Sequence, residues 1–167
     1  RNIIPSIKWA KEAGMTAQAT MCITYSQVHN AEYYINLAEE LIANGAQEIC
    51  LKDMAGILRP YEAFQLIKSL RAELPSTQIQ LHTHATAGFS SMTFLKAVEL
   101  GVEQVDTALS PFAEGSSLPA TEAVTAAFTN TPYAPTMEAS ALAEAAEYFK
   151  QLRERYIQKG YISPAAL

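Results

Sequence analysis

The chain is poor in charge and has no basic stripe. Only 17% of its 167 residues are charged, and 12 Lys and Arg against 17 Asp and Glu give a formal net charge of -5. Proteins that bind nucleic acid usually cluster basic residues to neutralise phosphates, so we expect no nucleic-acid partner. No apolar run reaches the roughly 18 residues that a membrane span needs, so we expect no transmembrane segment.

Cysteine is scarce, and no targeting signal is visible. The two cysteines, Cys22 and Cys50, each lie in an apolar strand-like run. This usage indicates two buried thiols in a reducing compartment, and we expect a cytoplasmic protein. The chain begins with Arg1, inside a helical pattern, rather than with Met. We therefore expect a piece cut from a longer protein.

Hydrophobic residues make up 49% of the chain, which indicates a folded domain with its own core. Four strand-like runs, at residues 17–25, 47–53, 78–84 and 103–109, alternate with helical patterns. Asn30 is a possible N-cap, Pro60 suits a first helical turn, and Gly45 suits a helix end. Successive runs begin roughly 25–31 residues apart, and this βα repeat implies an α/β protein with a parallel sheet.

The alternation within the strands distinguishes two parallel architectures. In the third run Ile79 and Leu81 share one face, whereas Gln80, His82 and His84 share the other. A doubly wound sheet buried on both faces would read as continuous apolar residues. One apolar and one polar face favours a barrel with helices outside and a polar site inside. We expect the C-terminal half of a TIM (β/α)8 barrel, about strands 5–8.

The pattern changes beyond the fourth strand-like run. We assign residues 1–130 to the barrel half and residues 131–167 to the start of a C-terminal helical region. Thr136 is a plausible cap for its long helix. The expected buried stripe, which would pack on the barrel or a later domain, contains Leu142, Ala145, Ala146, Phe149, Leu152 and Tyr156.

Candidate site residues gather where strands end. His82 and His84 share a strand face, so their imidazoles could bind one divalent metal or could simply line a polar channel. Lys52 ends the neighbouring run on the same face. A protonated lysine repels a metal and would pair with an acid or a substrate anion. A neutral lysine that reacts with CO₂ becomes an anionic carbamate and could bind the metal. Spacing alone does not choose between these roles.

Two motifs, "LKDMAG" and "LHTHATAG", together with "CITYSQVHNAEYYINLAEEL", closely resemble the carboxyltransferase domain of biotin-dependent enzymes. That family includes the oxaloacetate decarboxylase α subunit, the pyruvate carboxylase carboxyltransferase domain and the transcarboxylase subunit that uses oxaloacetate. The segments "YSQVHNAEYY" and "EGSSLPATE" look most similar to the oxaloacetate decarboxylase α subunit. The resemblance covers essentially the whole chain.

The resemblance implies a metal-dependent enzyme that transfers a carboxyl group between oxaloacetate or pyruvate and biotin. Lys52 matches the family's catalytic carbamylated lysine, and His82 and His84 match its histidine ligands for Zn²⁺, Mn²⁺ or Co²⁺. The family's aspartate ligand, on an Arg-Asp strand, would precede Arg1. Biotin would sit on a separate carrier domain. Further copies of the chain, and membrane subunits of a sodium pump, are the other expected partners.

Two more residues follow strand ends and could reach the substrate. Met54 comes just after the second run, although ordinary packing would also explain it. Tyr25 ends the first run and is a candidate of the same kind. Three further residues are expected to be structural: His29 in a loop, Asp53 facing away from Lys52 or capping a turn, and Asp106 as a polar partner inside the barrel.

Other functions remain open from the sequence. Pyruvate carboxylase or transcarboxylase is the alternative within the same family. An acyl-CoA lyase or synthase of the related metal barrels would share the His-x-His pattern, but those enzymes usually have Gly-Asp-Thr where this chain has "KDM". A third possibility is an inert structural or assembly unit, because half a barrel and one metal ligand are missing. Exposed strand edges would then need a partner.

Overall fold

The computed structural model describes residues 2–164. Its centre is a four-stranded parallel sheet in the order β1-β2-β3-β4. The strands are β1 (Gln18–Cys22), β2 (Glu48–Asp53), β3 (Gln78–Thr83) and β4 (Gln104–Val105). Each expected strand is present, but all four are shorter than their apolar runs, and β4 is reduced to two residues.

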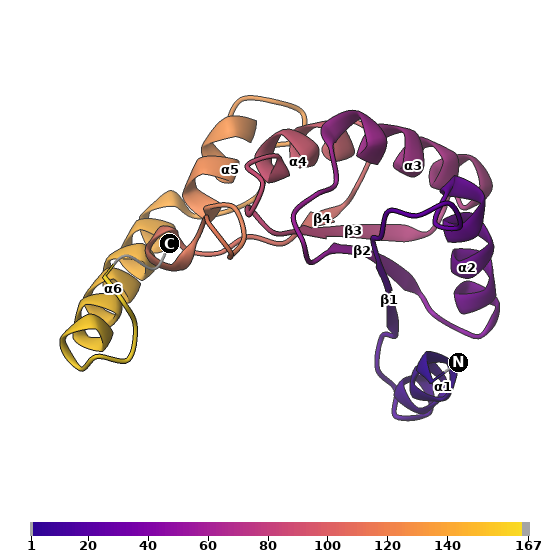
Figure 1. The fold of residues 1–167 in the computed structure, drawn as a ribbon, viewed down its shortest axis with the longest axis horizontal. Helices are drawn as coiled ribbons and strands as arrows, with labels where there is room; N and C mark the ends of the chain where they lie inside the picture. The colour runs from indigo at the N-terminus through magenta and orange to yellow at the C-terminus, as the bar shows by residue number, and fades with distance from the viewer. Residues whose placement is uncertain (1, 165–167) are drawn as a thin grey trace.

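Helices alternate with the strands. Before β1 comes α1 (Ile3–Glu12), and α2 (Ala31–Ala43), α3 (Pro60–Glu73) and α4 (Ser90–Val98) connect successive strands. These three connecting helices lie over one side of the sheet, while the other side is open (Figure 1). After β4 follow η1 (Ser110–Phe112), α5 (Thr121–Phe128) and α6 (Ala139–Gln158). The α/β class and the parallel topology are confirmed.

Local sequence signals place the helix starts. The Asn30 side chain accepts a hydrogen bond from the backbone N–H of Tyr33, so it caps α2 as expected. Pro60 occupies the first position of α3, where its missing N–H leaves no intrahelical bond unmade. Tyr34, Ala38 and Leu41 bury the inner face of α2. These signals fix where α2 and α3 begin and which face α2 turns to the sheet.

The two faces of the sheet differ as the alternation predicts. The helix-covered face is buried and contains Ala19, Met21, Ile23, Ile49, Leu51, Asp53, Ile79, Leu81 and Thr83. The open face carries Gln18, Thr20, Cys22, Glu48, Cys50, Lys52, Gln80 and His82. We refer to these as the covered face and the open face.

One cysteine departs from the expectation of two buried thiols. Cys50, in the second strand, is buried, but Cys22 is exposed. Cys22 lies on the open face of β1, which is an edge strand of the sheet, so no neighbouring helix covers it.

The C-terminal region also differs from its prediction. The expected cap Thr136 is wrong, because Met137 and Glu138 precede the helix and α6 begins at Ala139 with Glu138 as N-cap. No α6 residue is fully buried, and the expected stripe is at most half-buried, with Tyr156 exposed. The reason is that α6 packs on η1 rather than on the sheet, with the Phe149 and Phe112 ring centroids 6.2 Å apart. Figure 1 shows α6 extending away from the strands.

Across the described part of the chain, no helix combines the length and the apolar character that crossing a membrane requires.

Candidate metal and substrate site

The carboxyl ends of β2 and β3 bring the principal candidates together on the open face. Lys52 and His82 are register partners on adjacent strands, and Cys22 of β1 is the partner of Lys52 on its other side. Neighbouring strands lie about 4.8 Å apart, so these side chains emerge in one row. His84 follows β3 on the same side, and its ring centroid is 5.1 Å from that of His82. The structure therefore places Lys52, His82 and His84 in one cluster.

His82 is held through one ring nitrogen only. Its Nδ1 lies 2.7 Å from Oδ2 of Asp106. A carboxylate can only accept, so Nδ1 carries a proton, and in the neutral imidazole Nε2 therefore keeps its lone pair. The Nε2 atom is buried and has no hydrogen-bond partner within residues 2–164. A buried polar atom without a partner is unfavourable unless something else binds it, and a metal ion is such a partner.

His84 has the same tautomer for a different reason. Its Nδ1 lies 2.6 Å from the backbone oxygen of Ser116. Because a carbonyl also only accepts, Nδ1 of His84 carries the proton, and its Nε2 is left with a lone pair. Two neutral imidazoles, each oriented through Nδ1, are a donor pair that suits Zn²⁺, Mn²⁺ or Co²⁺. The histidine pair thus fits the metal that the resemblance implies.

The described residues hold no group of three or more His, Cys, Asp or Glu side chains that could bind a metal. The remaining candidate beside the imidazoles is Lys52, which is half-buried. Between residues 2 and 164 its Nζ makes no hydrogen bond or ion pair, so the salt-bridge role considered from sequence finds no partner there. A protonated amine would not complete the site, whereas a carbamate would add an oxygen donor.

Asp53 builds the turn that follows β2. It is completely buried on the covered face, and its carboxylate accepts from the backbone N–H groups of Ile57 at 3.1 Å and Leu58 at 2.8 Å. It also accepts from the Thr83 hydroxyl at 2.7 Å. Asp53 therefore faces away from Lys52 and caps the turn, as expected, and it ties that turn to β3.

The same turn contacts the backbone of His84. The backbone oxygen of Asp53 accepts from the His84 N–H at 3.1 Å. Gly56 has φ +67°, and a Cβ there would lie 2.4 Å from the His84 carbonyl oxygen. Both the backbone conformation and the close approach require glycine. The turn and the histidine strand are consequently joined at the candidate site.

The two substrate candidates lie in different places. Met54 follows β2 directly and is 58% exposed, which leaves it available at the strand end. The Tyr25 hydroxyl instead donates to Glu62 at the start of α3, beside Arg59. Burial and the Glu62 carboxylate raise the pKa of Tyr25 to about 12. Both assignments stay predictions, and Tyr25 is not gathered with the histidines.

Tyr25 lines a separate hollow of about 440 Å³ between the beginnings of α2 and α3, together with Tyr34 and Leu58. His29 borders it, with Nδ1 2.8 Å from the Ser26 hydroxyl and its ring edge-on to Tyr33. These contacts agree with a structural role for His29.

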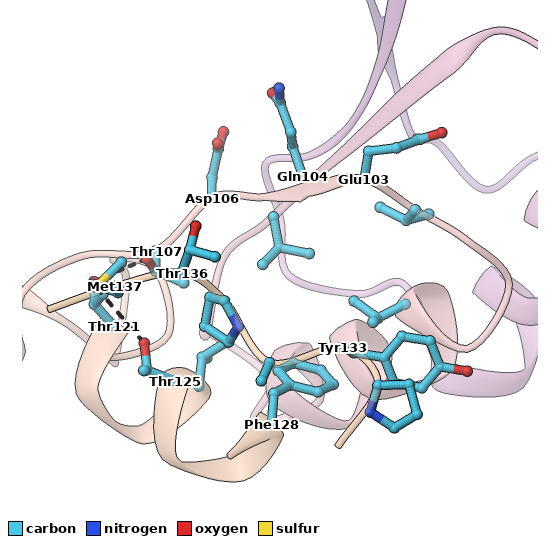
Figure 2. A pocket seen from close by; sticks show the side chains of 17 residues that line it. Glu103, Gln104, Asp106, Thr107, Thr121, Thr125, Phe128, Tyr133, Thr136 and Met137 are labelled. Atoms are coloured by element: carbon cyan, nitrogen blue, oxygen red, sulfur yellow. Dashed lines mark hydrogen bonds between the residues drawn. The ribbon is translucent and has the colours of Figure 1, made fainter. Parts of the chain in front are cut away.

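A second hollow, of about 670 Å³, lies beside β4 on the helix side. Figure 2 shows Gln104 and Asp106 projecting from the strand segment away from Phe128 and Tyr133, which line the opposite wall. The hollow is therefore distinct from the histidine cluster, although Asp106 borders both.

Sequence reasoning gave Asp106 only the general role of a polar partner and did not single out Gln80. Asp106 accepts from both His82 and Gln80, the latter at 2.5 Å. The alternation that placed Gln80 and His82 on one face was the available signal. The pairing across 24 residues to Asp106 could not be read from it.

A model of one known family, described as HMGL-like, matches residues 1–149. The chain belongs to the HMGL-like family. It is 43% identical to a pyruvate carboxylase subunit of Methanocaldococcus jannaschii over 156 residues, which is 93% of this chain and 27% of that protein. It is 38% identical to the methylmalonyl-CoA carboxyltransferase 5S subunit of Propionibacterium freudenreichii subsp. shermanii, over 93% of this chain and 31% of that protein.

Solved structures similar to this HMGL-like chain point to the same kind of domain as the sequence relatives do. The carboxyl transferase domain of Rhizobium etli pyruvate carboxylase with 3-hydroxypyruvate superposes with a TM-score of 0.89 at 32% identity, covering 93% of this chain and 27% of that one. The resemblance to carboxyltransferase domains is thus confirmed, and these relatives are enzymes. The chain spans between about a quarter and a third of the length of the relatives named here.

Proposed function

We propose that this chain is part of a metal-dependent carboxyltransferase that moves a carboxyl group between oxaloacetate or pyruvate and biotin on a separate carrier domain. The observation that carries the proposal is the pair of imidazoles with unused Nε2 atoms beside Lys52. Lys52 distinguishes this carboxyltransferase proposal from the acyl-CoA lyase and synthase alternatives. Within the family we propose an oxaloacetate decarboxylase α-type subunit.

The four strands would form the C-terminal half of a TIM barrel, about strands 5–8. Three features support this proposal: the open face is polar, β1 and β4 are both edge strands, and a hollow lies along β4. A complete barrel has no sheet edges, and its active site lies at the carboxyl ends of the strands. The remaining strands, with the aspartate ligand that the resemblance implies, would come from another part of the protein.

Lys52 would act as a carbamate. Its neutral amine attacks the carbon of CO₂, a C–N bond forms, and one proton leaves to solvent. The product is an anion whose oxygens can bind a cation, unlike the lysine it replaces. Lys52 and His82 share a register position on adjacent strands, so the new oxygens would emerge next to Nε2 of His82.

Each residue of the cluster would have a defined task. His82 and His84 would hold the metal through Nε2, because both Nδ1 atoms are already engaged. A bound divalent metal supplies Lewis-acid polarisation of the 2-oxo group of the substrate, which favours loss or gain of CO₂ at the neighbouring carbon. Met54, exposed beside the strand end, would contact the substrate and help exclude water.

Metal content tests this proposal. In the full-length protein we expect about one divalent metal per chain, and weak or absent metal in the isolated 167-residue chain, which we expect to be inactive. Lys52→Ala should remove the metal, and removal of CO₂ from the buffer should lower metal content in the full-length protein. Lys68→Ala, on the exposed side of α3, is the matched control. Full metal occupancy in Lys52→Ala would contradict the carbamate role.

Pyruvate carboxylation is the second candidate, favoured by the similarity to the pyruvate carboxylase of Methanocaldococcus jannaschii. The two differ in partners. A decarboxylase would work with membrane subunits and show sodium-stimulated loss of CO₂ from oxaloacetate. A carboxylase would instead make oxaloacetate from pyruvate. Measuring both reactions with the native complex decides between them. The mass of that complex tests the expected homo-oligomer, and cell fractionation tests the expected cytoplasmic location.

A further inference from the structure

A line of hydrogen-bonded polar side chains crosses the open face and ends at His82. Nε2 of Gln18 lies 3.0 Å from Oε2 of Glu48 and 2.6 Å from Oε1 of Gln80. Nε2 of Gln80 lies 2.5 Å from Oδ1 of Asp106, and Oδ2 of Asp106 lies 2.7 Å from Nδ1 of His82. The line joins β1, β3 and the segment after β4.

The direction of every bond in this line follows from its chemistry. Both carboxylates accept only, so Gln18 must turn its amide nitrogen toward Glu48, and Gln80 must turn its amide nitrogen toward Asp106. The Gln80 oxygen then faces Gln18, which donates to it. Each amide orientation is thus fixed by its two neighbours. At the end of the line, a neutral His82 must carry its proton on Nδ1, because Asp106 can only accept.

Asp106 has both carboxylate oxygens occupied. One accepts from Gln80 and the other from His82, so the carboxylate cannot rotate without losing a bond. The His82 side chain is 17% exposed and that of Asp106 is 32% exposed. This partial shielding keeps their interaction stronger than a fully exposed pair would be. Burial, followed by the Asp106 charge, raises the pKa of the nearby Cys50 thiol to about 11.

We propose that Asp106, held in place by Gln80, is a positioning residue that fixes the tautomer and ring orientation of His82 so that its buried Nε2 is presented as a metal ligand. The metal part of this inference rests on the proposed function, whereas the tautomer part does not. Gln80 acts only through Asp106, and Glu48 has no role at His82.

His84 provides an internal contrast. It is oriented by the main-chain oxygen of Ser116, which no side-chain substitution removes. Loss of Asp106 should therefore loosen one of the two imidazoles and leave the other in place. We expect weakened metal binding rather than the complete loss that follows removal of a ligand.

The first experiment measures metal affinity of the full-length protein in competition with a chelator, with Co²⁺ as probe. Asp106→Asn should weaken binding by about 10–100-fold, the usual effect of losing a partner that orients a ligating histidine, and should shift the Co²⁺ absorption spectrum. Glu48→Gln is the matched control: it also neutralises an open-face carboxylate of this line, but it does not touch His82. It should change affinity by less than about twofold.

A second pair of variants tests whether Gln80 acts through Asp106. Gln80→Leu should weaken binding less than Asp106→Asn does, and the double variant should be no weaker than Asp106→Asn alone, because residues in one chain of contacts are not additive. Full additivity would contradict this order of action.

A measurement without metal separates the two proposals. Selective ¹⁵N labelling of histidine in the metal-free, full-length protein should show His82 protonated at Nδ1, and mixed tautomers in Asp106→Asn. If His82 has the Nε2–H tautomer, or if Asp106→Asn leaves both tautomer and affinity unchanged, the positioning role is wrong. If the full-length protein takes up no metal but shows the expected tautomers, the proposed function fails and the hydrogen-bonding role of Asp106 stands.

Discussion

The covered face and the open face of the same four strands differ in burial and in the bonding of their side chains. On the covered face, side chains such as Leu51 and Leu81 are fully buried under α2, α3 and α4. Replacing either leucine with a smaller residue would leave a cavity. On the open face, Lys52 and His82 are half-buried and keep functional atoms without partners among the described residues. Alternating residues of one strand thus serve folding and chemistry separately, so the two properties should respond separately to substitution.

The polar pair on the covered face shows how the faces are connected. Asp53 and Thr83 are buried among apolar residues, yet they bond to each other and to the turn that ends at Leu58. Their role is to hold the carboxyl ends of β2 and β3 in register, where the open-face cluster begins. The covered face therefore supports the site mechanically without contributing a ligand.

The largest effect should come from a cavity in the covered face. Leu81→Ala should destabilise the domain by about 2–5 kcal/mol, because Leu81 is fully buried in a central strand. Hydrogen exchange of the β2 and β3 amides in the full-length protein measures this. Gln78→Ala, at an exposed position of the same strand, is the control and should change little. Equal effects of the two variants would break the distinction between the faces.

Removal of an open-face ligand should give the opposite pattern. His82→Gln should lower the metal affinity of the full-length protein at least about 100-fold, since loss of a partner that merely orients such a histidine already costs about 10–100-fold. Hydrogen exchange of the sheet should stay near that of the unsubstituted protein, because no core contact is lost. Metal analysis after dialysis gives the result. Strong sheet destabilisation would show that His82 is a folding residue.

Loss of the hydrogen bond between Thr83 and Asp53 should lower the free energy of unfolding by less than the Leu81 cavity does. Thr83→Val keeps the shape of the side chain but leaves the buried Asp53 carboxylate without one donor, which should destabilise the domain by about 1–3 kcal/mol. Thr83→Ser keeps the hydroxyl and should lose less. Thermal unfolding of the full-length protein compares the two. If Val and Ser behaved alike, the hydroxyl would not be the connecting group.

The smallest effect belongs to Tyr25, which lies outside both faces. Tyr25→Phe should cost about 0.5–1 kcal/mol at neutral pH through loss of the bond to Glu62. The folded-state pKa of about 12 exceeds the usual tyrosine pKa of 10.0, so the neutral phenol stabilises the fold below pH 10, and this contribution is lost as pH rises toward 12. The variant should therefore show a shallower alkaline loss of stability.

Unchanged metal content in Tyr25→Phe, with a reduced alkaline slope, would agree with a purely structural Tyr25. A loss of substrate affinity would instead favour the substrate-binding role predicted from its place at a strand end. Tyr34 keeps a raised pKa in both proteins, because of its burial, so only the difference between the two slopes is informative.

Local signals in the sequence predicted much of this arrangement. Period-two alternation identified the open and covered faces, and Asn30 and Pro60 marked helix starts, because each signal depends on neighbouring residues alone. The His82–His84 cluster with Lys52 followed from two strand ends in a parallel sheet. Asp53 as a turn cap is another local feature, set by the chain direction immediately after β2.

Features set by distant contacts could not be predicted. The bond between His82 and Asp106 depends on how β4 lies beside β3, and β4 has only two strand residues to define that register. The direction of Tyr25 depends on Glu62, 37 residues away. At Thr136 the residue type was right for a cap, but the backbone stays non-helical until Ala139.

The close contact between Gly56 and the His84 carbonyl oxygen has a consequence for building hybrid enzymes from related sequences. The turn after β2 and the end of β3 fit each other at a distance that admits no methyl group. A crossover placed between these two segments would take Gly56 and His84 from different parent sequences. Their close contact would then have to form between residues that are not matched to each other. Libraries should exchange residues 52–84 as one block or keep glycine invariant, so that recombined chains retain a usable site.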